Sequence, residues 1–393
     1  MRKFDVSDII NQFDEPCGTG IFEYIGSCAK GLTCFEGLCA NNSEAAINME
    51  GVDVRNSKHT CTTSTCRRKN WMHEIDGNQY LGEMSIPGTH DTMTATTGSH
   101  TNRVTRCGQC HSKNLKQQLE MGIRFLDIRL RCYSRKFWLY HGIESIGISF
   151  EDTLKIMKNF LTSNPSETII MSYKKEREPY DCSNLSFTTL FKQEWEKYLP
   201  ASMRYGYYVN KYFSRLKHVR GKVVLFDHYN NFKDYTLGKG FGWIWKYMEN
   251  TWKDVTYSTG TITSSYKSKL KTHITKSMNA VGNFKSIYIT YTSANDCGAA
   301  PYVTGWINRT PYKIAMKVNP FIEGYLRALN VRSDRFNKKN FGVVAMDYPN
   351  HGLVDEIIKR NPGTSDTHFS SCSILHLKTS VHLALNIDFI ISP

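Results

Sequence analysis

The sequence predicts an α/β fold: a distorted (β/α)8 barrel of the TIM type, preceded by a small cysteine-rich N-terminal module. Two observations favour this fold. Short β-branched or aromatic runs alternate with helical segments from Trp71 onward, and half of the twelve cysteines precede residue 67. Strands that alternate with helices are typical of a parallel sheet. An open, doubly wound sheet is the alternative, because no Gly-rich nucleotide-binding motif discriminates between the two architectures.

The predicted strands are short β-branched or aromatic runs. They lie at residues 80–87, 124–131, 136–142, 168–173, 222–228, 286–292 and 341–347. Residues 150–162 predict a helix between two of these strands, because their apolar side chains recur at helical spacing. These side chains are Phe150, Leu154, Met157 and Leu161. Asn164 and Pro165 then end the helix.

Composition divides the chain into three parts. Residues 1–69 form a cysteine-rich module with a polar linker, residues 70–362 form the barrel, and residues 363–393 form a C-terminal tail. The cysteines of the module are Cys17, Cys28, Cys34, Cys39, Cys61 and Cys66. Their spacing differs from that of paired CxxC zinc knuckles, so disulfides are favoured over a reduced or zinc-binding segment.

Cysteine usage also predicts the compartment. Disulfides indicate an oxidising environment, so the protein is expected to be extracellular or secreted. The formal net charge of +14 adds the expectation of peripheral contact with a membrane. The N-terminus nevertheless lacks the apolar segment of a secretory signal. Cysteines of the barrel are expected to pair as well, in a connectivity that sequence does not give. They are Cys107, Cys110, Cys132 and Cys182.

The charge balance predicts an anionic partner. The chain has 50 Lys and Arg against 36 Asp and Glu, which gives a formal net charge of +14. It has no nucleic-acid-binding motif, so an anionic membrane or a small phosphate ligand is the better interpretation. No run of about 18 apolar residues is present, so no transmembrane helix is predicted. The oligomeric state is left open.

Ionisable side chains collect at the carboxyl ends of the predicted strands, where barrel enzymes place their catalytic groups. They are His90, Asp91, Asp127, Arg129, His141, Lys174 and Asp347. Asp127 and Arg129 alternate along one strand, so both point to the same face. Two histidines and a guanidinium suit the cleavage of a phosphodiester by an internal hydroxyl. One histidine would act as base, the other as acid, and the guanidinium would stabilise the phosphorane.

The blocks SIPGTHDT, MGIRFLDIRLR, LYHG and NPSETIIMSYKKE resemble the X domain of phosphatidylinositol-specific phospholipase C in its compact bacterial form. RGKVVLFDHY and FGVVAMDYPN continue the resemblance in the same order, and the resemblance as a whole covers about residues 71–361. The resemblance implies a distorted α/β barrel. It also implies cleavage of phosphatidylinositol, or of a glycosylphosphatidylinositol, to diacylglycerol and inositol 1,2-cyclic phosphate.

The resemblance further implies a role for each catalytic candidate. His90 would deprotonate the inositol 2-hydroxyl and would be oriented by Asp347. His141 would protonate the diacylglycerol oxygen with the assistance of Asp91. Arg129 would contact the phosphoryl oxygens. Asp127 would hold this network together.

Substrate contacts are implied in the same way. Lys174 and Arg220 match cations that bind inositol hydroxyls, and Tyr266 matches an aromatic residue that stacks on the inositol ring. Ser264 stands where the bacterial pattern has an inositol-binding Asp, which puts inositol selectivity in doubt more than catalysis. Trp306 is the counterpart of a tryptophan at the membrane-contacting rim.

Arg129 also predicts that no metal cofactor is needed, because it stands where calcium-dependent relatives place an acidic residue. Two other functions are weighed against this one. A metal-dependent barrel phosphodiesterase, of the glycerophosphodiesterase or sphingomyelinase D type, would hold a divalent ion near the histidines with acidic residues. A non-catalytic inositol-lipid binding module would lack part of the machinery, yet His90, His141, Arg129 and Asp347 are all present.

Overall fold

The structure is a computed structural model of the chain. It describes residues 32–35, 38–41, 68–95, 108–142, 144–176, 186–206, 214–227, 248–250, 264–280, 287–293, 310–332 and 340–364. The chain divides into two units, Met1–Thr60 and Cys61–Pro393. The first contains an antiparallel hairpin of strands β1 (Leu32–Phe35) and β2 (Leu38–Asn41). The division predicted from composition, at residues 69/70 and 362/363, stays a prediction.

The second unit is built on a ten-stranded sheet, in which eight strands follow one path in the order β10-β11-β12-β3-β4-β7-β9-β8. All neighbours along this path are parallel. In path order the strands are Met248–Asn250, Ile287–Tyr291, Val343–Met346, Ile86–Thr89, Phe125–Tyr133, Ile169–Lys175, Val223–Asp227 and Arg204–Gly206. The predicted α/β class with a parallel sheet is therefore confirmed.

The path is curled, but its two ends are not joined. Among the described residues β8 pairs only with β9, and β10 only with β11, so the sheet forms a half-barrel and its predicted closure is not observed. The first predicted strand is also too long. Leu81–Glu83 is a short 3-10 helix, and β3 begins at Ile86.

The predicted strand at residues 136–142 is not part of the parallel path. It forms β5 (Lys136–His141), which turns back antiparallel onto β4 and pairs with β6 (Glu144–Ser149). The reversal occurs at Ser134 and Arg135, which have φ values of 53° and 60°. Two consecutive residues with positive φ are typical of the tight turn that joins the strands of a hairpin. His141 is therefore the last residue of the antiparallel strand β5, not the end of a parallel strand.

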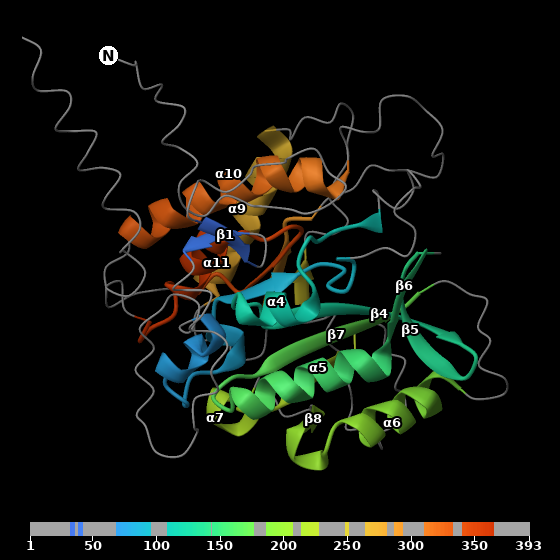
Figure 1. The fold of residues 1–393 in the computed structure, drawn as a ribbon. Helices are drawn as coiled ribbons and strands as arrows, with labels where there is room; N and C mark the ends of the chain where they lie inside the picture. Colours follow the sequence, from blue (N-terminus) through green and yellow to red (C-terminus); the bar gives the residue numbers. More distant parts are fainter. Residues whose placement is uncertain are drawn as a thin grey trace, which may run out of the picture. The chain divides into compact units, whose positions relative to one another are not determined.

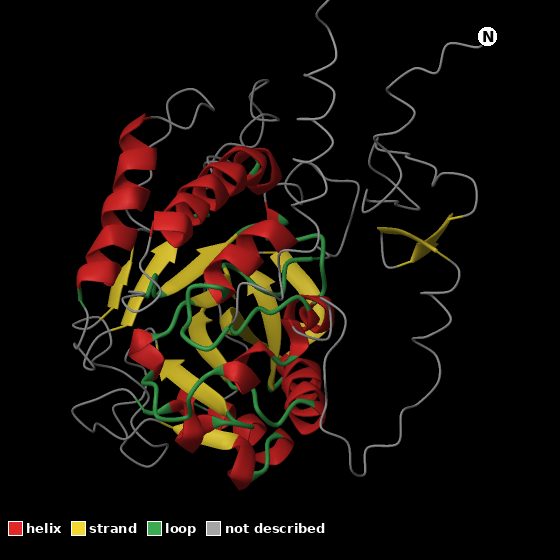
Figure 2. Cartoon of the chain, turned by 90° about the vertical axis from the view of Figure 1, so that its left-hand side faces the viewer, coloured by secondary structure: helices red, strands yellow, loops and turns green. Residues whose placement is uncertain are grey.

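Helices cover the sheet (Figures 1 and 2). They are α4 (Leu115–Glu120), α5 (Phe150–Ser163), α6 (Phe187–Tyr198), α7 (Leu216–Val219), α9 (Ser264–Asn279), α10 (Pro311–Arg332) and α11 (His351–Ile358). Short 3-10 helices lie at Trp71–Glu74 and Ala201–Met203. Helix α5 confirms the predicted helix at 150–162. It begins where the Ser149 hydroxyl accepts a hydrogen bond from the Asp152 amide.

An ion pair lies at the amino ends of the strands. Arg124, just before β4, and Glu167, just before β7, are both fully buried. Nε and Nη2 of Arg124 lie 2.9 and 2.8 Å from Oε2 of Glu167. Arg124 also donates to four backbone carbonyls, and Glu167 accepts from the Met72 amide. This network holds the backbone at Arg68, Lys69 and Met72 against the amino ends of the strands.

The cysteines only partly follow the prediction. Cys110 is a free, buried thiol, so the expectation that it is oxidised is wrong. In the fold the Cys110 side chain lies among the ionisable groups of the sheet end, and its Sγ donates to the Gly108 carbonyl at 3.8 Å. Cys132, on β4, is disulfide-bonded. Cys107, Cys182 and the six cysteines of the N-terminal module have no described side chain.

The described helices were also compared with the length and apolar character that a membrane crossing requires. None of them meets these requirements.

Candidate active site

The first pair of the site joins His90 to Asp347. His90 directly follows β3 and Asp347 directly follows β12, and these two strands are neighbours in the sheet. Nδ1 of His90 lies 2.9 Å from Oδ1 of Asp347, and both side chains are nearly fully buried. On its other side, Nε2 of His90 lies 2.8 Å from Nη2 of Arg129. A guanidinium can only donate, so Nε2 of His90 accepts its hydrogen bond. Nδ1 is then the protonated nitrogen, and it donates a hydrogen bond to Asp347.

The second pair joins His141 to Asp91. Nε2 of His141 lies 3.2 Å from Oδ2 of Asp91, and Nδ1 lies 2.8 Å from the carbonyl oxygen of Gly108. His141 is the more open of the two histidines, with 17% of its side chain exposed against 3% for His90. It therefore lies nearer to the solvent entrance of the site.

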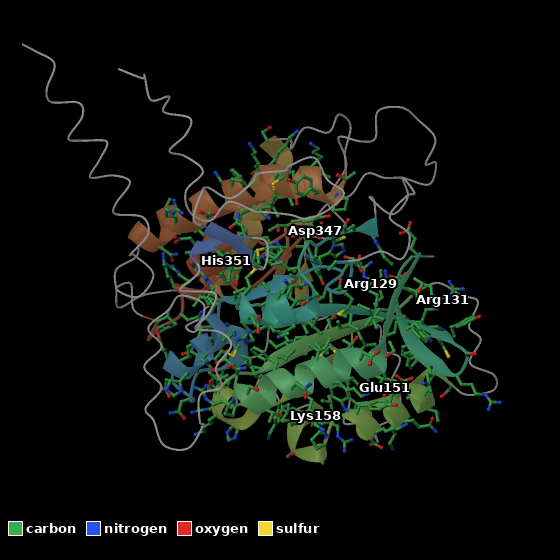
Figure 3. The ribbon with its side chains drawn as sticks, viewed as in Figure 1. Arg129, Arg131, Glu151, Lys158, Asp347 and His351 are labelled. Carbon is green, nitrogen blue, oxygen red and sulfur yellow. The ribbon has the colours of Figure 1, made fainter. Side chains whose placement is uncertain are left out.

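Arg129 lies between the two pairs. Its Nε is 2.5 Å from Oδ1 of Asp91, its Nη2 is 3.1 Å from Oδ2 of Asp127, and its Nη1 is 3.4 Å from Oε1 of Glu176. Asp127 also accepts a hydrogen bond from the Asp91 amide at 3.2 Å. Arg129 and Asp347, the two ends of the network through His90, are labelled in Figure 3. The guanidinium is thus held by carboxylates on three sides.

Backbone strain accompanies both pairs. Asp91 and Tyr348 have φ values of 45° and 42°, in the left-handed region that residues other than glycine seldom adopt. Asp91 follows His90, and Tyr348 follows Asp347. The structure around them supports this conformation: the Tyr348 amide donates to the Cys110 carbonyl, and Asn319 donates to the carbonyls of Asp347 and Tyr348. Strain of this kind is concentrated at functional sites.

The network shifts the ionisation of its members. Burial, together with the nearby Arg129 guanidinium, holds the pKa of His90 well below its usual range. Burial raises the pKa of Asp91 to about 6, although Arg129 and His141 oppose the shift. Burial alone would lower the pKa of Arg129, but Asp91, Asp127 and Glu176 raise it above its ordinary value. His90 is therefore neutral near pH 7 and can accept a proton.

Two groups of side chains bring possible metal ligands together. His90, Cys110 and Asp347 form one group, and Asp91, Cys110 and His141 form the other; within each, the donor atoms lie within 4.8 Å of one another. Cys110 is common to both. Burial raises the pKa of its thiol, and the carboxylates of Asp347 and Asp91 add to this shift.

Lys174 lies at the carboxyl end of β7, beside Arg129 on β4. Its Nζ is 3.5 Å from Oε1 of Glu176, and its side chain is 28% exposed. The structure therefore brings Lys174 to the edge of the site.

Arg220 is not in the site, which contradicts its expected role as a substrate-binding cation. It precedes β9 at the amino end of that strand. Its Nη1 donates to the carbonyls of Met72 and Ser166, and its Nη2 donates to the carbonyl of Ile75. The carboxyl ends of parallel strands lie at the opposite edge of the sheet, so this guanidinium cannot reach the histidines.

Of the remaining candidates on the substrate side, Tyr266 and Ser264 lie among the described residues. Tyr266 is 6% exposed and belongs to the apolar core, and its hydroxyl donates to the Thr292 carbonyl just after β11. A ring buried in this way has no free face for an inositol ring to stack on. Ser264 is exposed at the start of α9. Trp306 lies outside the described residues.

Sequence reasoning missed three members of the network. Glu176 follows Lys174 and Lys175, and of these three charged residues only Lys174 is among the predicted site residues. His111 is fully buried, and its Nε2 lies 2.6 Å from the His90 carbonyl. This contact holds the backbone of His90 in place. Glu144 stands opposite His141 in the β5–β6 hairpin, and burial raises its pKa. Glu144 and Glu176 lie two and three residues beyond a predicted strand, which is a usable signal for both, whereas His111 has no such signal.

Comparison with known proteins agrees with this geometry. Residues 84–229 match the family model described as phosphatidylinositol-specific phospholipase C, X domain. A protein from Listeria monocytogenes named 1-phosphatidylinositol phosphodiesterase is 28% identical over 299 residues, which are 75% of this chain and 85% of that protein. A protein of the same name from Staphylococcus aureus is 25% identical over 328 residues, 78% of this chain and 98% of that protein.

Solved structures show the same fold. The phosphatidylinositol-specific phospholipase C from Listeria monocytogenes is 26% identical, has a TM-score of 0.57, and matches 75% of this chain and 98% of its own. A double mutant of the corresponding Staphylococcus aureus protein has a TM-score of 0.61 at 23% identity, over 76% of this chain and 98% of its own. Residues 84–229 of this chain therefore form a region of the phosphatidylinositol-specific phospholipase C X-domain type.

Proposed function

We propose that this protein is a phospholipase C that cleaves phosphatidylinositol, or the inositol phosphodiester of a glycosylphosphatidylinositol, to diacylglycerol and inositol 1,2-cyclic phosphate. One observation carries the proposal: two histidine–carboxylate pairs, one buried and one partly exposed through His141, lie on either side of a single guanidinium. The names of the relatives support the choice of lipid.

In the proposed reaction, Nε2 of His90 removes the proton from the inositol 2-hydroxyl, which attacks the phosphorus. Asp347 stabilises the imidazolium that forms, because it accepts the hydrogen bond from Nδ1. His141 donates a proton from Nε2 to the leaving diacylglycerol oxygen, and Asp91 holds it in place. After this step His90 holds the proton taken from the hydroxyl, and His141 is neutral.

Arg129 would stabilise the phosphorane. Its guanidinium is already oriented by Asp91, Asp127 and Glu176, so it need not reorganise as negative charge develops on the phosphoryl oxygens. A fixed cation in this position would supply what a metal ion supplies in other phosphodiesterases. We therefore propose that turnover needs no metal ion.

The protein would act at a membrane surface. A formal net charge of +14 favours a surface rich in anionic lipid. The disulfide-bonded Cys132 supports an oxidising, extracellular compartment.

The proposal is tested by assaying purified protein on phosphatidylinositol micelles in excess EDTA. The intact protein should release diacylglycerol, whereas His90→Ala should lose at least about 10²-fold of this activity. His218→Ala is a matched control, because His218 is exposed on α7 at the amino ends of the strands. Equal activity of the two histidine variants would refute the role of His90.

A further inference from the structure

The site contains a thiol that the proposed reaction does not use. Cys110 is 1% exposed and lies in the loop before α4. It is a free cysteine, and its Sγ lies within 4.8 Å of ligand atoms from both histidine–carboxylate pairs. A reduced cysteine beside a histidine and a carboxylate completes a set of donors that thiophilic metal ions prefer.

We infer that Asp91, Cys110 and His141 form a binding site for a thiophilic divalent cation such as Zn²⁺, and that the bound cation inhibits the enzyme. The inhibitory part rests on the function proposed above. The binding part rests on the geometry alone.

The three donors suit zinc in type and spacing. Thiolate, imidazole nitrogen and carboxylate oxygen are its usual protein ligands, at about 2.0–2.3 Å from the ion. Neighbouring ligand atoms of a tetrahedral site are then about 3–4 Å apart. Here the donor atoms lie within 4.8 Å of one another, so they need to approach by at most about 1–2 Å.

Two of the ligands are already oriented toward a common point. Nδ1 of His141 donates to the Gly108 carbonyl, which leaves Nε2, facing Asp91, as the ring nitrogen available to a metal ion. Metal-binding histidines in proteins are held in the same way through their second nitrogen. Asp91 is 2% exposed, yet neither of its carboxylate oxygens makes a hydrogen bond. Arg129 pairs with Oδ1, while Oδ2 faces His141.

The group around His90 is less suitable. Both ring nitrogens of His90 are engaged, Nδ1 by Asp347 and Nε2 by Arg129. A cation bound there would also face the Arg129 guanidinium directly. The position beside His141 is better placed for entry, because His141 is the more exposed histidine.

The surrounding charge also favours a cation. Four carboxylates surround the site. Arg129 pairs with Asp91, Asp127 and Glu176, and Lys174 pairs with Glu176, whereas Asp347 pairs with His90. The carboxylates therefore exceed the cations in this cluster. A cation on Nε2 of His141 would occupy the atom from which this residue is proposed to deliver its proton, and turnover would stop.

The binding test is a titration of the reduced full-length protein with Co²⁺, whose thiolate complexes have a charge-transfer absorption. The intact protein should develop this absorption, and the difference spectrum against Cys110→Ala should isolate the contribution of Cys110 from that of the other cysteines. Glu144→Gln is the matched control: it removes a carboxylate beside His141 that is not one of the three ligands. It should retain the absorption.

The inhibition test uses phosphatidylinositol cleavage with added Zn²⁺, Ca²⁺ or Mg²⁺. Zn²⁺ alone should inhibit, and Cys110→Ala should raise the inhibitory Zn²⁺ concentration at least about tenfold. Equal Co²⁺ absorption or equal inhibition in Cys110→Ala would overturn the inference, as would no absorption in the intact protein. If the protein cleaves no phosphatidylinositol at all, the Co²⁺ spectra still decide the binding site. Failure of the proposed function is thus distinguished from failure of the metal-binding inference.

Discussion

Nη2 of Arg129 donates a hydrogen bond to Nε2 of His90 over 2.8 Å, so the guanidinium occupies the lone pair of the proposed base. A substrate that binds productively must break this hydrogen bond. The guanidinium then donates to a phosphoryl oxygen, and Nε2 of His90 accepts from a substrate hydroxyl. The anchors that hold Arg129 through its other nitrogens, Asp91 and Glu176, allow this exchange without loss of its position.

Replacement of this guanidinium by an ammonium should damage the transition state more than binding. Arg129→Lys keeps the charge but cannot bridge Asp91, Asp127 and a phosphoryl oxygen at once. We expect kcat to fall about 10²–10³-fold with a smaller change in KM, measured by steady-state kinetics on phosphatidylinositol micelles. A variant with full kcat would show that the planar group is dispensable.

The rate should depend on pH through Asp91. Its pKa is raised to about 6 by burial, so the carboxyl is protonated and neutral below this pH and ionised above it. Only the ionised form stabilises a protonated His141, so kcat/KM should rise as the pH increases through about 6. The pKa of His90 lies well below its usual range, so His90 stays neutral over the same interval.

The assignment of this rise in kcat/KM to Asp91 is checked with Asp91→Asn, whose side chain cannot titrate. Its pH–rate profile should have a lower plateau and no step near pH 6. Persistence of the step in this variant would assign it to a different group.

Lys174 and Arg220 should respond differently to the same substitution. Lys174 lies at the carboxyl end of β7 beside Arg129, so Lys174→Gln should raise KM several-fold at unchanged stability. Arg220 binds three backbone carbonyls at the amino ends of the strands, so Arg220→Gln should lower the unfolding midpoint and leave KM unchanged. Steady-state kinetics and thermal unfolding of both variants provide the comparison. A rise in KM for Arg220→Gln alone would contradict the observed fold.

The buried ion pair at the amino ends should dominate local stability. Glu167→Ala leaves the Arg124 guanidinium buried without its partner, which should lower the free energy of unfolding by about 3–5 kcal/mol. Glu323→Ala removes a carboxylate from an ion pair with Arg327, which is 57% exposed, and should change it by less than about 1 kcal/mol. Urea denaturation measures both. Similar values for the two variants would argue against a structural role for the buried pair.

The sequence allowed the central residues to be predicted because a general rule places them. His90 and Asp347 each directly follow a strand, and Asp127 and Arg129 alternate along one. The same rule argues against Arg220, which precedes its strand. Its expected role came from motif resemblance alone, and the structure overturned it.

Other features depend on long-range packing that the sequence does not encode locally. The β4–β5 turn at Ser134 and Arg135 contains none of the Asn-Gly or Gly-Gly pairs that usually mark such turns, so β5 was taken for a parallel strand. His111 supports His90 through a backbone carbonyl, a contact visible only in the folded chain. The sequence predicts that Cys110 pairs in a disulfide. In the folded chain it is a free thiol that lies among the catalytic candidates.

The central claim is attack by an internal hydroxyl with His90 as base and no metal ion. ³¹P NMR of phosphatidylinositol micelles with the protein in excess EDTA tests it most directly. The account predicts a five-membered cyclic phosphate signal that appears with the intact protein and is absent with His90→Ala. A linear phosphomonoester formed without the cyclic species, or a signal that requires added Ca²⁺ or Mg²⁺, would contradict it.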